Sequence, residues 1–278
     1  MDRWVNGPLS EFSSEGAGGR SVLVLDGTHE AEALCAGLAG RGWRVFRSAS
    51  RLLGTDGSDL VVLYGYRHIV SERVLADSSA RVVNLHISYL PFNRGAHPGF
   101  WCFFDGSPCG VTIHEVDAGI DTGPVLAQQL VDLDPWVLTF DEAYWRLRSS
   151  IEELFFARLE EIADPAVAGR PQVGRGTQRR SSELPSAFAG WTSVIGPEIE
   201  RLHGLAEHDR REAQRLIGEI EQVRSANNVN WMDILRLAFD LSPDRAREIL
   251  GRINADDGRI SQLLSALSQS SDHSAEDP

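Results

Sequence analysis

The sequence predicts an α/β protein with a doubly wound, mainly parallel sheet, followed by a small all-α C-terminal region. Two observations carry this prediction. Between residues 21 and 133, short runs of Val, Leu and Ile alternate with segments of helical pattern, which is typical of βαβ units in a parallel sheet. Near Pro197 the composition changes, and apolar residues then recur every three or four positions, as they do along one face of a helix.

The first predicted strand is SVLVLDG, residues 21–27, a continuous apolar run of the kind found in strands that are buried on both faces. A helix is expected over residues 28–42, with Thr28 as a candidate N-cap and Gly40 or Gly42 near its end. The same patterns predict further strands at residues 43–48, 59–65 and 81–88, and a short helix at residues 71–77.

Two more strands are predicted after residue 109, GVTIHEVD and PVLAQQLVDL, separated by the loop AGIDTG. A long helix then begins at Thr139, which can form a capping box with Glu142. From Pro165 to Arg180 the chain is rich in Pro, Gly and Arg and is predicted to be a loop. The apolar stripe of the long helix comprises Ala143, Leu147, Ile151, Leu154, Phe155, Leu159 and Ile162.

These patterns divide the chain into five parts. The first twenty residues lack the apolar stretch of a signal peptide and are rich in Gly and Ser, so a flexible leader is expected there, with a partner-binding arm as the alternative. Ser242-Pro243-Asp244 predicts a helix start, with a cap, an N1 proline and an acidic first turn. The predicted parts are a flexible leader at 1–20, the α/β domain at 21–180, a linker at 181–196, a helical domain at 197–268 and a disordered tail at 269–278.

Charge and composition exclude several classes of protein. The 278 residues include 27 Lys and Arg against 40 Asp and Glu, and the formal charge of −13 would repel a nucleic acid. No apolar run reaches the length of a membrane span, so no membrane association is expected. Three cysteines and no sign of export favour a reducing cytoplasm. Cys102 and Cys109 lack the spacing of metal ligands and are expected to be small core or loop residues, so no metal is expected.

Asn84 and His86 lie two apart at the carboxyl end of a predicted strand, so their side chains project from the same face. Ligands bind beyond such strand ends in doubly wound sheets. An isolated Asn-x-His is more often a pair of satisfied polar residues than a site. A second observation favours the site, because Asp121 lies in the glycine-flanked loop DAGIDTGPV, where a carboxylate can come beside the imidazole and orient it.

The segments NLHISYLPFNRGAHP and GVTIHEVDAGIDTGPVL resemble the folate-dependent formyltransferases, which include glycinamide ribonucleotide transformylase, methionyl-tRNA formyltransferase and the sugar N-formyltransferases. The resemblance covers about residues 21–180 and implies their Rossmann-like fold. It also implies that Asn84, His86 and Asp121 transfer the formyl group of N10-formyltetrahydrofolate to an amine. Attack on the formyl carbon creates an oxyanion, to which Asn84 can donate a hydrogen bond. His86 or Asp121 can receive the proton of the amine, and the residues do not say which.

The segment DLVVLYGYRHIVSERVL resembles the part of these enzymes that lines the folate pocket. The alternative is that Tyr66 and Ile69 are strand-end packing, that Asp117 is a turn acid and that His68 is a surface or core residue. His97 and His114 are expected to be structural or to face the substrate rather than to be catalytic. By resemblance, the residues around the pterin would be Leu63, Gly65, Tyr66, Arg67, His68, Ile69 and Asp117.

The acceptor amine is predicted from what surrounds this site. The enzymes that act on tRNA carry a basic C-terminal barrel, whereas this chain continues into acidic helices. The loop after His86 and the stretch RPQVGRGTQRR resemble enzymes that formylate amino sugars carried on nucleotide diphosphates. Guanidinium groups suit phosphate oxygens, although Arg179 and Arg180 are read almost equally well as solvated loop charges. The predicted substrate contacts are Tyr89, Asn93, Arg94, Gly95, Trp101, Arg179 and Arg180.

The sequence thus predicts a cytoplasmic N-formyltransferase that uses N10-formyltetrahydrofolate and formylates the primary amine of a nucleotide-linked amino sugar. Other small amines, such as an amino-acid or antibiotic precursor, and methionyl-tRNA are alternative acceptors. A catalytically silent folate- or nucleotide-binding scaffold is the alternative of a different class. The strand-helix start VLDGTHEAEAL lacks G-x-G-x-x-G and does not support a dinucleotide oxidoreductase. The C-terminal helices resemble no part of the family. They could pair two subunits, dock a partner or bind the nucleotide of the substrate, and the first, a homodimer, is the favoured role.

Overall fold

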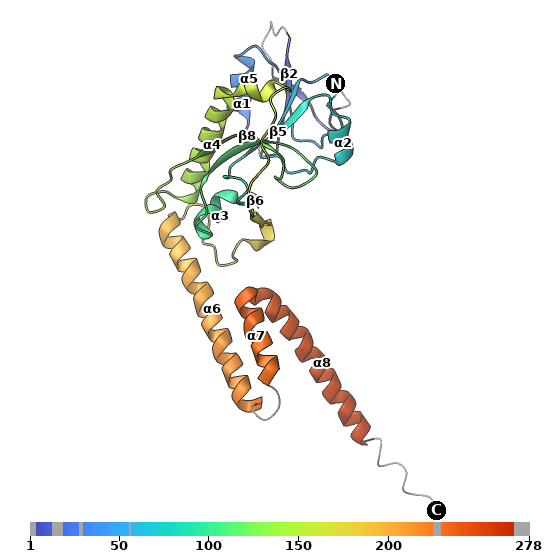
Figure 1. The fold of residues 1–278 in the computed structure, drawn as a ribbon, viewed down its shortest axis with the longest axis vertical. Coiled ribbons are helices and arrows are strands. Elements are labelled where there is room, and N and C mark those ends of the chain that lie inside the picture. Colours follow the sequence, from blue (N-terminus) through green and yellow to red (C-terminus); the bar gives the residue numbers. More distant parts are fainter. Residues whose placement is uncertain (1–3, 13–18, 28–29, 56, 225–228, 270–278) are drawn as a thin grey trace, which may run out of the picture. The chain divides into compact units, whose positions relative to one another are not determined.

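The computed structural model describes residues 4–12, 19–27, 30–55, 57–224 and 229–269. They form a β-sheet with helices packed on it, followed by further helices (Figure 1). Contacts divide the chain into two compact units, Met1–Glu200 and Arg201–Pro278. The first unit therefore includes the segment predicted as a linker, and it ends a few residues beyond the predicted start of the helical domain.

A seven-stranded sheet forms the centre of the first unit, in the order β1-β3-β2-β4-β5-β7-β8. The strands β3, β2, β4 and β5 are parallel, while β1, β7 and β8 pair antiparallel with their neighbours. The predicted α/β class with a parallel central sheet is confirmed. The strands are β1 (Ser10–Glu11), β2 (Ser21–Asp26), β3 (Arg44–Ser48), β4 (Leu60–Tyr64), β5 (Arg81–His86), β7 (Gly110–Glu115) and β8 (Val125–Leu130); β6 (Arg94–Gly95) and β9 (Gln178–Arg179) form a separate parallel pair.

Helices pack against this sheet (Figure 1). Helix α4 (Phe140–Ala157) begins with the predicted capping box of Thr139 and Glu142 and packs on β5, β7 and β8. Helix α1 (Glu32–Ala39) begins later than predicted, after Ala31 and without a side-chain cap; the predicted cap, Thr28, lies outside the described residues. The remaining helices of this unit are α2 (Glu72–Ala76), α3 (Pro98–Phe104), which the sequence did not predict, α5 (Leu159–Ala163) and the 3₁₀ turn η1 (Ser181–Glu183).

The N-terminal residues differ from the predicted flexible leader, because part of them joins the core. Trp4 and Val5 are only 5% exposed and pack with Leu23, Phe46 and other apolar side chains on one face of the sheet. Val5 bridges to Leu52, and the carbonyl of Trp4 accepts the backbone N–H of Leu53 at 2.6 Å. Burial of these two apolar side chains offsets the cost of ordering the segment, which the Gly- and Ser-rich composition alone did not indicate.

The predicted linker also packs on the first unit. The Phe188 ring lies 5.1 Å from that of Phe100 and 5.2 Å from that of Phe140, and the Trp191 ring meets Phe188 edge-to-face with the centroids 4.9 Å apart. These aromatic contacts extend the core from α3 and α4 into residues 181–196. The segment is consequently part of the α/β unit and not a free connection.

The second unit is helical, as predicted. It contains most of α6 (Ile195–Arg224), together with α7 (Val229–Leu241) and α8 (Pro243–Gln269), whose start at Pro243 confirms the Ser-Pro-Asp signal. Among the described residues its buried apolar core consists of Ile217, Phe239 and Ala246. Residues 270–278, most of the predicted tail, lie outside the described residues.

A disulfide joins Cys102 in α3 to Cys109 before β7, with the Cα atoms 5.3 Å apart. The sequence predicted these cysteines to be small core or loop residues and not metal ligands, and it did not predict that they pair. Disulfides are uncommon in a reducing cytosol, so this pair does not support the predicted compartment. In the described part of the chain, every helix is too short or too polar to cross a membrane.

Candidate active site

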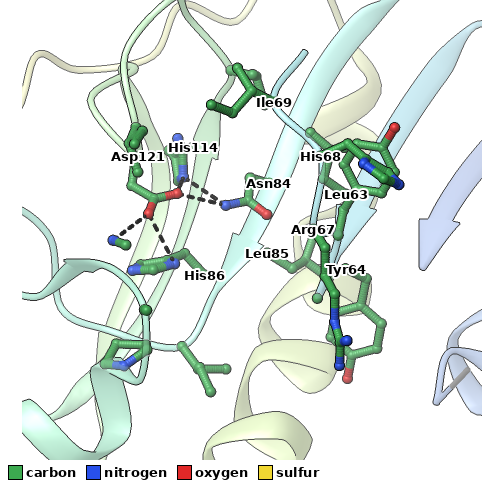
Figure 2. Close-up of a pocket in the computed structure, with 18 of the residues that line it drawn as sticks. Leu63, Tyr64, Arg67, His68, Ile69, Asn84, Leu85, His86, His114 and Asp121 are labelled. Carbon is green, nitrogen blue, oxygen red and sulfur yellow. Dashed lines mark hydrogen bonds and ion pairs between the residues drawn. The ribbon is translucent and has the colours of Figure 1, made fainter. Parts of the chain in front are cut away.

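Three polar side chains meet where the sheet changes from parallel to antiparallel. Asn84 and His86 lie at the carboxyl end of β5, and alternation puts both on one face of the sheet. Strand β7 runs antiparallel to β5, and His114 is the direct register partner of Asn84. Both imidazoles are almost fully buried, and Figure 2 shows them turned toward the same carboxylate.

Asp121 supplies that carboxylate from the loop between β7 and β8. Its φ of 53° lies in the left-handed region, which Asp tolerates better than most side chains. The loop is held by Asp117, whose Oδ1 accepts the Thr122 hydroxyl at 2.6 Å and the Gly119 N–H at 3.1 Å. A Cβ on Gly123 would stand 1.8 Å from the carbonyl oxygen of Glu115, so only glycine fits the tight return to β8.

The Asp121 carboxylate connects all the groups of the site. Its Oδ1 accepts the Asn84 amide at 3.0 Å and lies 3.5 Å from Nε2 of His114. Its Oδ2 accepts the backbone N–H of Gly95 at 2.8 Å and lies 3.7 Å from Nδ1 of His86. The structure therefore brings together Asn84, His86 and Asp121, and it adds His114.

The proton positions of the two imidazoles are assigned from the nearest hydrogen-bond acceptor of each ring. Nε2 of His86 lies 3.2 Å from the Asn93 carbonyl, within hydrogen-bond distance, whereas Nδ1 lies 3.7 Å from Asp121, so we assign the proton of the neutral ring to Nε2. Nδ1 of His114 donates to the Glu115 carbonyl at 2.7 Å, so Nε2 of His114 accepts the Asn84 amide at 3.2 Å. A proton taken up by His86 would thus enter at the nitrogen that faces the carboxylate.

Asn84 differs from its expected arrangement. Its Nδ2 group donates one hydrogen to Asp121 and the other to His114. Both amide hydrogens therefore already bond to acceptors of the protein. From the sequence, Asn84 was expected to donate a hydrogen bond to the oxyanion of the reaction. A hydrogen bond from Asn84 to a reacting oxygen requires the amide to release one of these partners when substrate enters.

Burial and charge oppose each other at this site. Desolvation lowers the pKa of His86 below 6.5, the nearby charge of Asp121 opposes this shift, and His114 adds to it. Burial alone would raise the pKa of Asp121, but His86, His114 and the Gly95 N–H together hold it well below its usual value. We therefore describe the resting pair at neutral pH as an anionic carboxylate beside a neutral imidazole.

A cavity of about 700 Å³ opens beside these side chains. Tyr64, Tyr144 and Arg148 form another part of its wall, which the sequence interpretation did not identify. Tyr66 contributes its ring, but its hydroxyl is turned away, since it donates to the Ser50 carbonyl and accepts the Leu52 N–H. The wall includes all the residues predicted to surround a pterin, Leu63, Gly65, Tyr66, Arg67, His68, Ile69 and Asp117.

The predicted substrate contacts are mostly placed elsewhere. Gly95 lines the cavity, but Arg94 donates to Gln172, and Arg179 pairs with Asp105 at 2.8 Å while its guanidinium lies over the Trp101 ring. Asn93 is fully buried and its amide bonds Ser107. The structure thus does not bring Tyr89, Asn93, Arg94, Trp101, Arg179 or Arg180 to the cavity wall.

Two other histidines had open roles in the sequence interpretation. His97, at the start of α3, lines the cavity and packs against Trp191 with the rings tilted by 37° and their centroids 5.2 Å apart. His114 belongs to the central cluster, because β7 pairs antiparallel with β5 and brings it opposite Asn84. Among the described residues, no group of three or more His, Cys, Asp and Glu is arranged to hold a metal ion.

The proteins to which this chain is similar are all formyltransferases in the comparisons that follow. The family model described as formyl transferase matches residues 47–159. A dTDP-4-amino-4,6-dideoxyglucose formyltransferase of Mycobacterium bovis is 29% identical over 136 residues, which are 48% of this chain and 58% of that protein. A methionyl-tRNA formyltransferase of Geobacter metallireducens is 30% identical over 150 residues, 54% of this chain and 43% of that protein. This chain therefore spans less than two thirds of the length of these relatives.

A solved structure is similar over a larger share of its own length. It is that of the formyltransferase PseJ from Anoxybacillus kamchatkensis, in complex with UDP-4,6-dideoxy-4-formamido-L-AltNAc and tetrahydrofolate. The two chains are 31% identical, with a TM-score of 0.57, and the match covers 64% of this chain and 96% of that one.

Proposed function

This chain belongs to the formyl transferase family, and we propose that it moves a formyl group from N10-formyltetrahydrofolate to the primary amine of a nucleotide-linked amino sugar. The observation that carries the proposal is the cluster of Asn84, His86 and Asp121 at the wall of a large cavity. PseJ, which binds tetrahydrofolate and a formylated UDP-sugar, and the dTDP-sugar relative support the acceptor class.

The proposed reaction begins with attack of the acceptor nitrogen on the formyl carbon. A C–N bond forms, the carbonyl oxygen becomes an oxyanion, and the amine becomes an ammonium that must lose a proton. His86 accepts that proton at Nδ1, where the Asp121 carboxylate stabilises the resulting imidazolium. The bond from the formyl carbon to N10 of the folate then breaks, the amide carbonyl re-forms, and N10 takes the proton that His86 received, which returns the imidazole to its neutral form.

Asn84 and His114 act on the oxygen and on the geometry. We assign the oxyanion bond to the Asn84 amide, which exchanges one of its present acceptors for the reacting oxygen. His114 holds Asn84 before that exchange, because its Nε2 accepts an amide hydrogen at 3.2 Å. A donor already positioned and desolvated in this way stabilises developing charge more than water does.

The wall from Leu63 to Ile69 fits the folate co-substrate. It offers backbone groups next to an apolar surface, and Ile69 is 71% exposed even though it is a large aliphatic residue. A flat pterin would cover that side chain and meet the backbone of Gly65 and Arg67. Bound there, the folate supplies the activated one-carbon unit.

The rate is expected to depend on the protonation of His86. Because burial lowers the pKa of His86 below 6.5, the reactive neutral ring is fully present at about pH 7 and above, and it is lost as the pH falls through the lowered value. After correction for the fraction of the acceptor amine that is neutral, we expect kcat/KM to be constant above about pH 7 and to fall only below 6.5. A pH-rate profile from 4.5 to 9 checks this, and a fall that begins above about pH 7 would contradict it.

Identification of the acceptor tests the proposed function itself. The full chain is incubated with N10-formyltetrahydrofolate and a panel of dTDP-, UDP- and GDP-linked amino sugars, and release of tetrahydrofolate is followed. Formylation of at least one nucleotide sugar supports the proposal. Other small amines and methionyl-tRNA are assayed in the same way, and turnover only with one of these would replace the acceptor class. Absence of tetrahydrofolate release with every acceptor would remove the proposed function.

We further propose that the helical unit pairs two copies of the chain. Along α7, Ile234, Leu237 and Leu241 are 61%, 59% and 76% exposed and recur at helical spacing, so they form one apolar stripe. Leu237→Gln with Leu241→Gln is expected to convert a dimer into a monomer in sedimentation velocity, while Asp240→Asn on the same helix leaves it dimeric. A wild-type chain that sediments as a monomer would refute the pairing.

A further inference from the structure

Gln172 lies in the segment between α5 and β9 and joins two loops that are far apart in the sequence. Its Nε2 donates to the carbonyl oxygen of Asp121 at 2.8 Å and to that of Gly123 at 2.9 Å. Its Oε1 accepts Nε and Nη2 of Arg94 at 3.1 and 2.6 Å. Both ends of one side-chain amide are thus used, one on the loop of Asp121 and the other on the segment that contains Gly95.

These two segments define the position of the Asp121 carboxylate. The Asp121 loop places the backbone of Asp121 in the left-handed region. This conformation costs about 1–2 kcal/mol for a residue with a Cβ and persists only when its surroundings hold it. The segment that contains Gly95 provides the backbone N–H from which Oδ2 of Asp121 accepts a hydrogen bond at 2.8 Å. Gln172 therefore fixes the loop that carries the carboxylate against the segment that binds it.

The segment around Gln172 is itself firmly placed. β9 pairs with β6 next to it, and Arg94 N–H donates to the Thr177 carbonyl at 3.0 Å. A Cβ on Gly176 would lie 2.3 Å from the Pro91 carbonyl oxygen, so the two backbones are in close contact there. Gln172 does not line the cavity, and any effect it has on the reaction acts through Asp121.

We propose that Gln172 is a positioning residue, which holds Asp121 beside His86 through its two bonds to the Asp121 and Gly123 carbonyls. The inference rests on the proposed formyl transfer. It assigns a role to a residue that the sequence interpretation left in an unstructured loop. A displacement of about 1 Å in a reacting group can lower a rate on the order of 10²-fold, so a residue outside the cavity can control turnover.

Gln172→Glu separates the contact of Gln172 with Arg94 from its contacts with the Asp121 and Gly123 carbonyls. A glutamate still accepts from Arg94, but it has no N–H for the two carbonyls and repels them. We expect kcat to fall about 10- to 100-fold with KM for both substrates changed less than about 3-fold. Gln129→Ala, which changes an exposed glutamine on β8, is the matched control and is expected to keep wild-type kcat.

A readout that needs no turnover separates this claim from the proposed function. Asp121 raises the pKa of His86, while burial and His114 lower it, so displacement of the carboxylate must lower the pKa of His86 further. Titration of His86 by NMR in the full chain is expected to show that shift in Gln172→Ala, which removes the bonds to the loop without adding a charge. If wild type transfers no formyl group but the titration shifts, the formyl transfer fails and the positioning stands. An unchanged titration, or a lower melting temperature with wild-type kcat, would overturn the positioning role.

Discussion

Asp121→Asn is expected to lower kcat by about 10²- to 10⁴-fold while the protein stays folded. Asparagine has the same shape and tolerates the left-handed φ of 53°, and its Oδ1 can still accept the Gly95 N–H. It carries no charge, so the imidazolium formed at His86 loses the carboxylate 3.7 Å away. Steady-state kinetics and a thermal melt measured together separate lost chemistry from lost structure.

Asn84→Ala and His86→Ala are expected to show the same large loss, because each removes one contact of the Asp121 cluster. Asp132→Asn, the same replacement at an exposed position after β8, is the matched control and should keep wild-type kcat. Near-normal turnover in any of the three cluster variants would remove the role assigned to that residue. The pKa of His86 should also fall further in Asp121→Asn, since the charge that raises it is gone.

Gly95→Ala is expected to lower kcat/KM by at least about 10²-fold and to reduce the free energy of unfolding by about 2–4 kcal/mol. The φ of Gly95 is 88°, and an added Cβ would stand 2.3 Å from the carbonyl oxygen of Arg179. The backbone must then move, which separates β6 from β9 and withdraws the N–H from Asp121. Urea unfolding and steady-state kinetics of the same preparation measure both effects.

Gly106→Ala is the control for backbone strain alone. Its φ is 64°, but nothing lies within 4 Å of the position of an added Cβ. We expect a loss of about 1 kcal/mol in the free energy of unfolding and unchanged kcat/KM. Equal effects at Gly95 and Gly106 would show that close contact with Arg179 has no consequence.

Much of the architecture follows from local patterns in the sequence. Continuous Val and Leu runs predicted β2 and β4 because such runs are buried on both faces, and the capping box predicted the start of α4. Alternation alone placed Asn84 and His86 on one face. The glycine-flanked loop allowed Asp121 to come beside His86, and the family resemblance made that contact an expectation, since no local pattern by itself gives a contact across 35 residues.

The remaining features depend on contacts between distant segments. A strand pattern carries no direction, so the reversal that places His114 opposite Asn84 could not be read from it. Arg94 and Arg179 looked suited to phosphate, but each has a partner far along the chain that composition does not reveal. Similarly, the side chain of Gln172 reaches a loop 51 residues earlier.

The contacts of the N-terminal residues affect how the protein should be prepared. Trp4 and Val5 hold the segment around Leu52 and Leu53, and the N–H of Leu52 in turn donates to the hydroxyl of Tyr66 on the cavity wall. Removal of Trp4 and Val5 would therefore loosen one wall of the proposed folate cavity. Folate affinities measured without these two residues would not describe the protein that contains them.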